Sequence, residues 1–282
     1  MSMYDFVKFW RTPPVNTRED AELKLSEPSF AIRFVYHSGR TENKDITWND
    51  TLEIFETGSV SNFTGSIRTL FEIVGAQNAW NKALDMVYSL DSKLDVESVL
   101  SLHAILMDGC YDPLRTAKGE TPGAFKKGFY VVGPLETGCA PEDARSEMVE
   151  FLKEIQPFWE LACRKEHNES TVLKVAAWSH CRFENIHAFA DGNGRLGRLL
   201  LNMLLMRNAF PPVVFDFELK NRYCEALQAF HEHEHEHEHE TIRPFLDFLV
   251  ENLERTWRRQ TCRQERTFQS FDEDPNANEL ER

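Results

Sequence analysis

Apolar residues recur every three or four positions over most of the chain from Asp50 onward, which is the spacing of one buried helix face. The spacing predicts a helix that includes residues 69–83 and another that begins after Asp95, a suitable N-cap. Residues 141–159 and 171–182 show the same period. The first 30 residues, interrupted by a Pro-Pro pair, show no such period and are expected to be irregular. The pattern indicates a mainly α-helical protein.

Strand-like sequence is confined to residues 123–132, GAFKKGFYVV. Gly128 lies inside this segment and is a candidate hairpin turn. No repeat of 20–50 residues is visible in the sequence, which argues against a solenoid. The expected fold class is therefore mainly α, with one small β-hairpin.

The composition is that of an ordinary globular chain, since 41% of the 282 residues are hydrophobic and 28% are charged. This length allows one large domain or two. Acidic residues outnumber basic ones, 46 against 32, which gives a formal net charge of −14. Because binding to phosphate backbones or anionic lipid needs a surplus of Lys and Arg, neither nucleic acid nor a membrane surface is an expected partner.

The cysteines and the apolar stretches point to a cytoplasmic protein. The six cysteines lie far apart and include no C-x-x-C pair, which indicates reduced thiols rather than a disulfide framework: Cys110, Cys139, Cys163, Cys181, Cys224 and Cys262. The opening segment, MSMYDFVKFWRTPP, has no apolar stretch resembling a signal peptide. The most apolar stretch, 199–206, is interrupted by Asn202 and is far shorter than the roughly 20 residues that cross a bilayer.

Two stretches have a biased composition. Residues 231–240 alternate strictly as HEHEHEHEHE, and the last residues, SFDEDPNANELER, are polar and acidic and are expected to be frayed or disordered. The alternating tract satisfies the zinc-protease pattern H-E-x-x-H, but a dipeptide repeat does so through composition alone and lacks the apolar positions that pack a helix. We expect an exposed linker here. Adventitious metal binding at its imidazoles and zinc catalysis are the alternatives.

Candidate chemistry is concentrated in residues 186–198, IHAFADGNGRLGR. The Asp-Gly-Asn-Gly run at 191–194 tolerates unusual backbone angles, so successive amide N–H groups can turn toward one point. This run leads into a helix whose apolar positions are Leu196, Leu199, Leu200, Met203 and Leu204. Because the free N–H groups and the positive dipole end of that helix face the run, the sequence predicts an anion site.

The charged residues around this run fit a chain of phosphates. Arg195 and Arg198 are three positions apart, so both project from one face of the first turn and can grip neighbouring phosphates. Asp191 offers a carboxylate oxygen suited to Mg²⁺, and His187 can take a proton at neutral pH. A glycine-rich turn with a core histidine and two solvated arginines is the simpler alternative. Several complementary residue types within a dozen positions favour the catalytic interpretation.

The same stretch resembles the signature of the Fic family, H-x-F-x-[DE]-G-N-G-R-x-x-R, with Ala188 in place of the usual proline. Proteins of that family mostly transfer AMP from ATP to a hydroxyl group of a target protein. The resemblance covers roughly residues 30–250 and implies a Fic-type helical bundle with protein adenylyltransferase activity. It implies ATP as substrate, Mg²⁺ or Mn²⁺ as cofactor, and three regions: an extension over 1–30, a core over 31–250, and a C-terminal helix with an acidic tail over 251–282.

The resemblance also implies a role for each residue of the stretch. His187 would be the general base on the target's Ser, Thr or Tyr hydroxyl, Phe189 would anchor the loop in the core, and Asp191 would hold the metal ion. The residues implied in nucleotide binding are Gly192, Asn193 and Gly194 at the α- and β-phosphates, Arg195 at the β-phosphate, Arg198 at the γ-phosphate, and Tyr223 near the adenine. An aromatic residue at helical spacing is also ordinary core, so a core role for Tyr223 stays open. His180 is expected to pack in the core.

Residues 123–132 lie where the family has its flap, a hairpin that pins the backbone of the target protein beside the site. The candidate flap residues are Gly123, Phe125, Lys126 and Tyr130. Strand addition of this kind would align a hydroxyl group without reading much of the target's side-chain sequence, while a plain surface turn is the alternative. The expected partner is a target protein on this flap, and self-modification and a homodimer are further expectations.

Residues 38–43, SGRTEN, resemble the [ST]-x-x-x-E-[GN] motif of Fic proteins that carry their own inhibitory helix. The motif positions are Ser38, Glu42 and Asn43. In that class the glutamate pairs with the second arginine of the signature, here Arg198, and displaces the γ-phosphate. A carboxylate in that place satisfies the guanidinium and repels the triphosphate, so bound ATP is held unproductively.

Two further functions stay open. Some proteins with this glutamate also remove AMP from a modified protein by using the carboxylate to orient a water, so Glu42 is compatible with a deAMPylase at the same site. The other is a catalytically silent module that binds nucleotide or a partner. The intact His187 argues against it, because a site that only binds has no need of a base.

Overall fold

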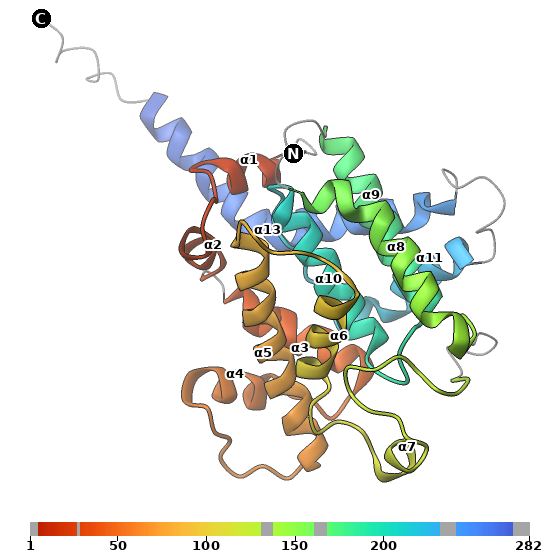
Figure 1. Ribbon diagram of the computed structural model, residues 1–282. Helices are drawn as coiled ribbons and strands as arrows, with labels where there is room; N and C mark the ends of the chain where they lie inside the picture. The colour runs from red at the N-terminus through yellow and green to blue at the C-terminus, as the bar shows by residue number, and fades with distance from the viewer. Residues whose placement is uncertain (1–4, 27–28, 131–137, 161–167, 232–240, 273–282) are drawn as a thin grey trace, which may run out of the picture.

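In the computed structural model the described residues are 5–26, 29–130, 138–160, 168–231 and 241–272, and they form packed α-helices without a β-strand (Figure 1). The helices are α1 (Asp5–Arg11), α2 (Arg18–Leu25), α3 (Phe30–Glu42), α4 (Trp48–Thr57), α5 (Ile67–Tyr88), α6 (Val96–Leu106), α7 (Pro113–Ala117), α8 (Ala144–Trp159), α9 (Glu169–Ile186), α10 (Asn193–Arg207), α11 (Lys220–His231) and α13 (Arg243–Asp272). Two 3-10 helices, η1 (Pro141–Asp143) and η3 (Phe217–Leu219), lead into α8 and α11. The mainly α fold class predicted from the sequence is confirmed.

Helix α10 lies in the middle of the bundle and packs against α3, α5, α6, α8 and α9 (Figure 1). Every residue from Asn193 to Arg207 is buried, with the exception of Gly194. A helix buried on all sides is typical of the core of a large domain. The first turn of α10 carries the signature arginines, so surrounding helices hold those arginines from several directions.

Side-chain caps fix the starts of the helices around α10. The Asp95 carboxylate accepts the N–H of Ser98, and the Ser98 hydroxyl accepts the N–H of Asp95, which makes a capping box at the start of α6. Ser66 caps α5 and Asn168 caps α9 through the corresponding backbone N–H. The helix start predicted after Asp95 is confirmed.

The N-terminal region differs from the sequence prediction. Irregular structure over the first 30 residues is wrong for 5–11 and 18–25, which form α1 and α2. Phe6 and Trp10 of α1 are buried, and the Trp10 ring meets Trp257 of α13 edge-on with ring centroids 5.7 Å apart. A helix this short has little stability of its own, so packing against α13 and not an internal period stabilises it. The domain boundaries at residues 30 and 250 stay predictions.

The segment expected to be a β-hairpin has no strand in its described part. Residues 123–130 are turns and extended backbone, and 131 and 132 lie outside the described residues. The N–H of Lys126 donates to the carbonyl of Ala188 at 2.9 Å, and the N–H of Cys139 donates to the carbonyl of Ile186 at 3.0 Å. These contacts tie the segment to the loop between α9 and α10. The hairpin itself is not confirmed.

At the C-terminus, α13 supplies the predicted C-terminal helix. Residues 232–240 and 273–282 lie outside the described residues, so the exposed linker and the frayed tail stay predictions. The described cysteines Cys110, Cys139, Cys181 and Cys224 are free thiols. A search of the described helices finds none with the length and apolarity needed to cross a membrane.

Candidate active site

Two residues with left-handed backbone shape the loop between α9 and α10. His187 is the C-cap of α9 at φ 47° and ψ 53°, and Gly192 is the N-cap of α10 at φ 84°. A Cβ on Gly192 would lie 2.5 Å from Sδ of Met107, so this position needs glycine for space as well as for its backbone angle. The two turns bring His187 and the start of α10 to the same cavity.

Phe189 anchors the loop in the core, as expected. Its ring is fully buried and stacks on His103 of α6 with centroids 3.9 Å apart. Nδ1 of His103 accepts the N–H of Gly123, which has φ 79°, so Nε2 carries the proton and donates to the carbonyl of Asp191 at 2.9 Å. Burial lowers the pKa of His103 to about 4 and keeps this ring neutral. The loop is thereby fixed from the side of α6.

The side chain of Asn193 closes the loop on itself. Its Nδ2 donates to the carbonyl of Phe189 at 2.8 Å, and its Oδ1 accepts the N–H of Phe189 at 3.0 Å. What Asn193 offers a ligand is therefore its backbone. As the first residues of α10, Asn193, Gly194 and Arg195 have N–H groups with no acceptor one turn earlier in the helix. That is the geometry of an anion site at a helix N-terminus.

A cavity of about 430 Å³ opens at this end of α10. It is lined by residues that are distant in the sequence: Glu42, Arg115, Tyr130, His187, Ala190, Asp191, Gly192, Asn193, Gly194 and Arg195. Its volume falls in the range of small-molecule sites. Most of the residues singled out in the sequence therefore meet in one space, although Arg198 and Tyr223 are not among the described residues that line it.

His187 is half-buried at this cavity. Burial, and after it the charge of Lys126, lowers the pKa of the imidazole to about 4. The Glu184 carbonyl and the carboxylates of Glu42 and Asp191 act in the opposite direction. At pH 7 the ring is neutral and able to accept a proton, which is the state that a general base requires.

Asp191 is surrounded by guanidinium groups. Its Oδ1 accepts the N–H of Gly192 at 2.7 Å and Nη2 of Arg195 at 3.2 Å, and its Oδ2 accepts Nη2 of Arg68 at 2.9 Å, with Nη2 of Arg115 at 3.7 Å. Burial alone would raise the pKa of this carboxyl, but the three arginines and the N–H of Gly192 outweigh burial and lower it. Asp191 is therefore ionised.

This setting fits a metal ion that arrives with phosphates better than a metal site made by the protein alone. Among the described residues, no group of three or more His, Cys, Asp or Glu side chains is placed to hold a metal ion. Mg²⁺ commonly takes one or two carboxylates together with substrate phosphates and water. A single ionised carboxylate at the edge of a cavity of small-molecule size meets that requirement, so Asp191 is the residue that would hold such an ion.

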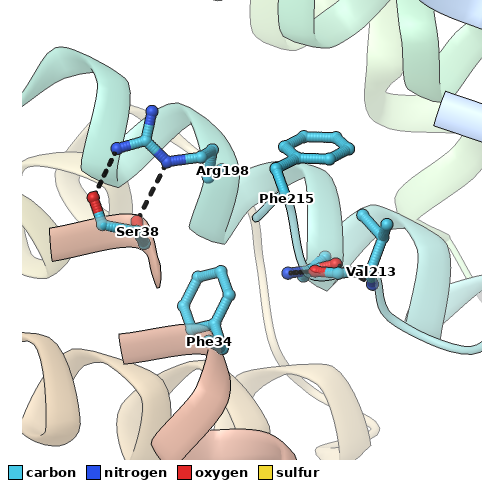
Figure 2. Close-up of a pocket in the computed structure, with 6 residues that line it drawn as sticks. Phe34, Ser38, Arg198, Val213 and Phe215 are labelled. Atoms are coloured by element: carbon cyan, nitrogen blue, oxygen red, sulfur yellow. Dashed lines mark hydrogen bonds between the residues drawn. The ribbon is translucent and has the colours of Figure 1, made fainter. Parts of the chain in front are cut away.

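Arg198 is buried against the last turns of α3 (Figure 2). Its Nε donates to Oγ of Ser38 at 2.9 Å, and its Nη2 donates to the Ser38 carbonyl at 2.9 Å and to Oε1 of Glu42 at 2.7 Å. The space between Arg198, Ser38, Phe34 and Phe215 is too tight for a water molecule. The structure thus places Glu42 against the second signature arginine, the contact that the motif predicts.

The Glu42 carboxylate is ionised in this contact. Burial acts to raise its pKa, but the charge and the hydrogen bond of Arg198 outweigh burial and lower it. Although its partner is buried, 37% of the Glu42 side chain is exposed, on the side that lines the cavity.

Tyr223 lies behind Arg198, outside the cavity wall. It is buried, its hydroxyl is 2.8 Å from Nε2 of His180, and the Arg198 guanidinium lies 5.7 Å from its ring centroid. In this position Tyr223 supports Arg198, and contact with an adenine ring stays a prediction. His180 stacks on Phe245 in the same buried cluster, and its expected core position is confirmed.

The candidate flap residues are tied to the loop. Phe125 stacks on Phe189 with centroids 5.7 Å apart, and the Lys126 side chain is buried. Tyr130, which lines the cavity, donates its hydroxyl to Oε1 of the buried Glu120 at 2.8 Å. The segment is thus braced from both sides next to His187, a place that suits a substrate-docking element.

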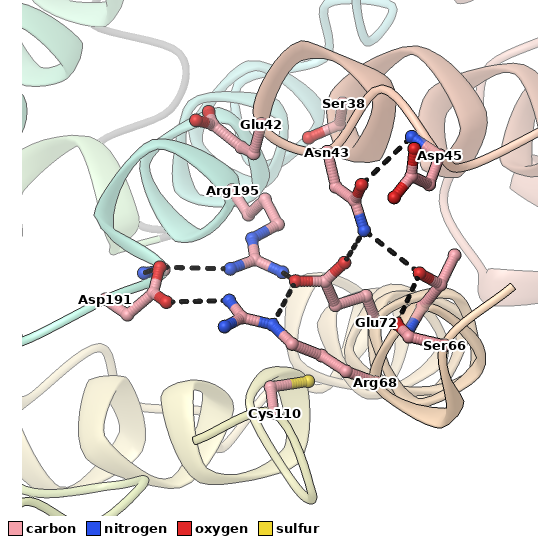
Figure 3. A network of polar contacts seen from close by, with 12 residues as sticks. Ser38, Glu42, Asn43, Asp45, Ser66, Arg68, Glu72, Cys110, Asp191 and Arg195 are labelled. Atoms are coloured by element: carbon pink, nitrogen blue, oxygen red, sulfur yellow. Dashed lines mark hydrogen bonds and ion pairs between the residues drawn. The ribbon is translucent and has the colours of Figure 1, made fainter. Parts of the chain in front are cut away.

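Three charged residues of the site are missed by sequence reasoning. Arg68 and Glu72 come from α5 and lie beside Arg195 (Figure 3), and Arg115 of α7 lines the cavity. An arginine and a glutamate four positions apart usually mark an exposed helix face. The available signal is that Glu72 falls between Thr69 and Ala76, on the face with helical apolar spacing, where a carboxylate needs a partner.

Fold and site together define a helical protein in which a glycine-containing loop, lined with charged residues, precedes a buried central helix. The Fic/DOC family model matches residues 93–205, so the chain contains a Fic/DOC domain. Two curated relatives, both named protein adenylyltransferase Fic, come from Aedes aegypti (29% identical over 235 residues) and Nematostella vectensis (30% over 226 residues). The alignments cover 83% and 80% of this chain, but 42% and 47% of those relatives. The chain thus spans less than half the length of these curated relatives.

Solved structures agree on the fold. A Fic domain containing signaling protein from Bacteroides thetaiotaomicron matches with a TM-score of 0.74 and 22% identity, covering 90% of this chain and 94% of that chain. Fic-1 from C. elegans matches with a TM-score of 0.69 and 24% identity, covering 94% of this chain and 72% of that chain. The shared fold extends well beyond the family match at 93–205, because these matches cover nine-tenths or more of this chain.

Proposed function

We propose that this protein is an adenylyltransferase that moves AMP from ATP to a hydroxyl group of a target protein. The observation that carries the proposal is one cavity that joins a neutral imidazole, the open N–H groups of α10 and a buried arginine: His187, Asn193, Gly194 and Arg195. The names of the curated relatives support the same activity. The scattered cysteines favour a reducing, cytoplasmic setting.

The reaction is an in-line displacement at the α-phosphorus of ATP. His187 takes the proton of the target hydroxyl, and the oxygen forms a bond to the α-phosphorus while the bond to the bridging oxygen breaks. The electron pair leaves with pyrophosphate, and the imidazolium then loses its proton. The N–H groups at the start of α10 and Arg195 hold the phosphates and oppose the charge that develops on them.

Magnesium or manganese, held by Asp191, would neutralise phosphate charge when bound. Residues 123–132 would dock the backbone of the target protein beside His187, since Phe125 and Lys126 already contact the loop. The same cavity would also accept a segment of a second copy, so self-modification is the practical assay.

Glu42 acts as a brake in this proposal. Its carboxylate occupies the guanidinium of Arg198 at 2.7 Å and presents negative charge to the cavity where the γ-phosphate would lie. ATP that enters must therefore compete with an ion pair already in place. Release of Glu42 would free Arg198 for phosphate and turn the α-phosphorus toward the base.

The test compares purified wild-type protein, Glu42→Gly and the double variant Glu42→Gly/His187→Ala with ATP labelled at the α-phosphate. We expect self-modification to rise at least tenfold in Glu42→Gly and to be lost in the double variant. Label at the γ-phosphate, used as a control, should remain unincorporated. Mass spectrometry identifies the modified residue. If the Glu42→Gly protein binds ATP but transfers no label, the adenylyltransferase proposal is wrong and the site only binds nucleotide.

A second function, removal of AMP from a modified protein, is favoured by one specific observation. Glu42 and His187 line the same cavity, so one carboxylate and one imidazole would face a phosphate bound there. Glu42 would orient a water toward the phosphorus of the AMP–protein bond. Wild-type protein should then release AMP from modified Glu42→Gly protein, and a Glu42→Gln variant should not.

A further inference from the structure

Four charged side chains at the site form a closed ring of alternating sign, which we call the charge ring (Figure 3). Oε1 of Glu72 accepts Nε of Arg68 at 3.0 Å, and Nη2 of Arg68 donates to Oδ2 of Asp191 at 2.9 Å. Oδ1 of Asp191 accepts a hydrogen bond from Nη2 of Arg195 at 3.2 Å. Nη1 of Arg195 lies 3.3 Å from Oε1 of Glu72, and this ion pair closes the ring. Two carboxylates and two guanidiniums therefore balance one another.

Glu72 is the most deeply placed carboxylate of this ring. Its side chain is 2% exposed, compared with 20% for Asp191, and Arg195 beside it is 3% exposed. In such surroundings a carboxylate and a guanidinium hold each other in fixed positions, because neither has water as a substitute partner. Asp191 faces the cavity and is open to a ligand, while Glu72 stays covered.

Glu72 also reaches the inhibitory segment. Its second oxygen, Oε2, accepts Nδ2 of Asn43 at 2.6 Å, and Asn43 is the C-cap of α3, directly after Glu42. Nδ2 of Asn43 also lies 3.2 Å from Oγ1 of Thr69, one turn before Glu72 on α5. A single buried carboxylate thus connects the end of the inhibitory helix to the first signature arginine.

We propose that Glu72 is a positioning residue with two arms. One arm orients Arg195 toward the phosphates, and the other, through Asn43, fixes the end of α3 so that Glu42 meets Arg198. This inference rests on the proposed function and adds to it a residue on α5, outside the range that the Fic/DOC model matches. Glu72 touches no nucleotide itself and acts through Arg195 and Asn43.

The arm to Arg195 is tested by nucleotide binding, which does not depend on turnover. In the Glu42→Gly protein, Glu72→Gln should weaken the binding of a fluorescent ATP analogue about tenfold, because Arg195 loses a charged partner and turns toward Asp191. In a Glu42→Gly/Arg195→Ala protein, the same Glu72→Gln change should weaken it less than about twofold, since Glu72 then has no arginine to orient. Glu251→Gln, which breaks an exposed pair with Arg222, is the control and should leave affinity unchanged.

The arm to the brake is tested by self-modification. Asn43→Ala should raise the rate of the otherwise unchanged protein about three- to tenfold, because the end of α3 loses its hydrogen bond to Glu72. In the Glu42→Gly background the same change should have no effect. An unchanged rate in the wild-type background overturns this arm.

The outcomes separate this inference from the proposed function. If the Glu42→Gly parent neither binds ATP nor transfers AMP, the proposed function and the inference about Glu72 are both wrong. If the parent binds and transfers but Glu72→Gln leaves its affinity for the ATP analogue unaltered, the arm to Arg195 alone is wrong. The same holds if Glu72→Gln weakens affinity equally with and without Arg195, because Glu72 would then serve only the fold. Circular dichroism checks folding, and if Glu72→Gln is unfolded, Glu72→Asp keeps the charge and should give a smaller loss with the same dependence on Arg195.

Discussion

The two signature arginines sit one turn apart on α10, and both are buried, yet their partners differ. Arg198 pairs with Glu42, whose side chain is 37% exposed at the end of α3, and with the hydroxyl and carbonyl of Ser38. Arg195 pairs with Asp191 and with Glu72, whose side chain is 2% exposed in the middle of the bundle. One arginine therefore has a partner that solvent and ligand can reach, and the other has a partner that they cannot.

The contrast separates a contact that a ligand can exchange from one that stays in place. Displacing Glu42 returns to water a carboxylate whose side chain is already 37% exposed, and an incoming phosphate takes its place at Arg198. Displacing Glu72 would remove one charged partner from a carboxylate that is 2% exposed and cannot turn to water instead, which costs more. Regulation is therefore expected at Arg198, and constant geometry at Arg195.

Both arginines are expected to bind phosphates, while His187 takes the proton. His187→Ala tests this division of roles and should have the largest effect. In the Glu42→Gly background we expect transfer to fall by about 10²–10⁴, because the base is lost. Affinity for a fluorescent ATP analogue should stay within about twofold of the parent, because both arginines are still present to bind the phosphates.

Retention of transfer in His187→Ala would contradict the role of the base. A pH profile gives an independent check in the Glu42→Gly protein. Since the pKa of His187 is lowered to about 4, its neutral form persists far into the acid range. The rate should therefore hold down to about pH 5 and fall only below it, whereas an unperturbed imidazole would lose activity near its usual pKa of about 6.5.

The brake at Arg198 should also respond to residues that hold α3 without touching either arginine. Nζ of Lys220, at the start of α11, donates to the carbonyl of Thr41 at 2.6 Å, directly before Glu42. Lys220→Ala should raise self-modification about two- to fivefold by loosening this turn, given the modest net value of one charged hydrogen bond near the surface.

Arg222→Ala is the matched control for Lys220→Ala, because it removes a cation two positions later whose partner is Glu251. The rate of Arg222→Ala should equal that of the wild type. If Lys220→Ala has the same effect in the Glu42→Gly background as in the wild type, then it acts elsewhere and the position of α3 is not what limits the reaction.

The smallest expected effect concerns Glu184 of α9, which lies against α10 where a Cβ on Gly197 would clash with its carboxyl. Burial raises the pKa of Glu184 to about 8; Arg198 acts against this and Glu42 adds to it. Glu184 is therefore neutral at pH 7, which leaves Glu42 as the ionised partner of Arg198. Its contribution to stability is full below about pH 4.5 and is lost as pH rises through about 8, because the folded-state pKa is the higher one.

Glu184→Gln removes this titration. We expect its melting temperature, relative to that of the wild type, to rise by a few degrees between pH 5 and pH 9. A constant difference across that range would show that Glu184 is already ionised in the folded protein. Glu42 would then have a competitor for Arg198, and the contrast between the two arginines would weaken.

The sequence predicts the helices and the loop correctly where local signals are strong. Asp95 caps α6 as expected, and Phe189 anchors the loop. Helical spacing identifies the apolar face of α5, which is buried as expected. The loop was recognisable because Asp-Gly-Asn-Gly combines backbone freedom with charge in consecutive positions, so its chemistry does not depend on the rest of the fold.

Other features depend on contacts that no local pattern encodes. Phe6 and Trp10 show too short a pattern to indicate a helix, and α13 supplies the surface that stabilises α1. Arg68 and Glu72 resemble an exposed pair in the sequence, and only the packing of α10 against α5 brings Arg195 to Glu72. Tyr223 lies under Arg198, a position that spacing along α11 does not predict because it does not say which neighbour covers the buried face of Tyr223.

Because Glu42 and Glu72 come from helices that precede the family-matched range, residues 93–205 cannot be excised as an independent unit. In such a fragment both arginines would remain on α10, but Asp191 would be the single carboxylate left of those that neutralise them. Two desolvated cations without counter-charges oppose the burial of the helix that carries them. An expression fragment designed for crystallography or for target screening therefore has to begin upstream of α3.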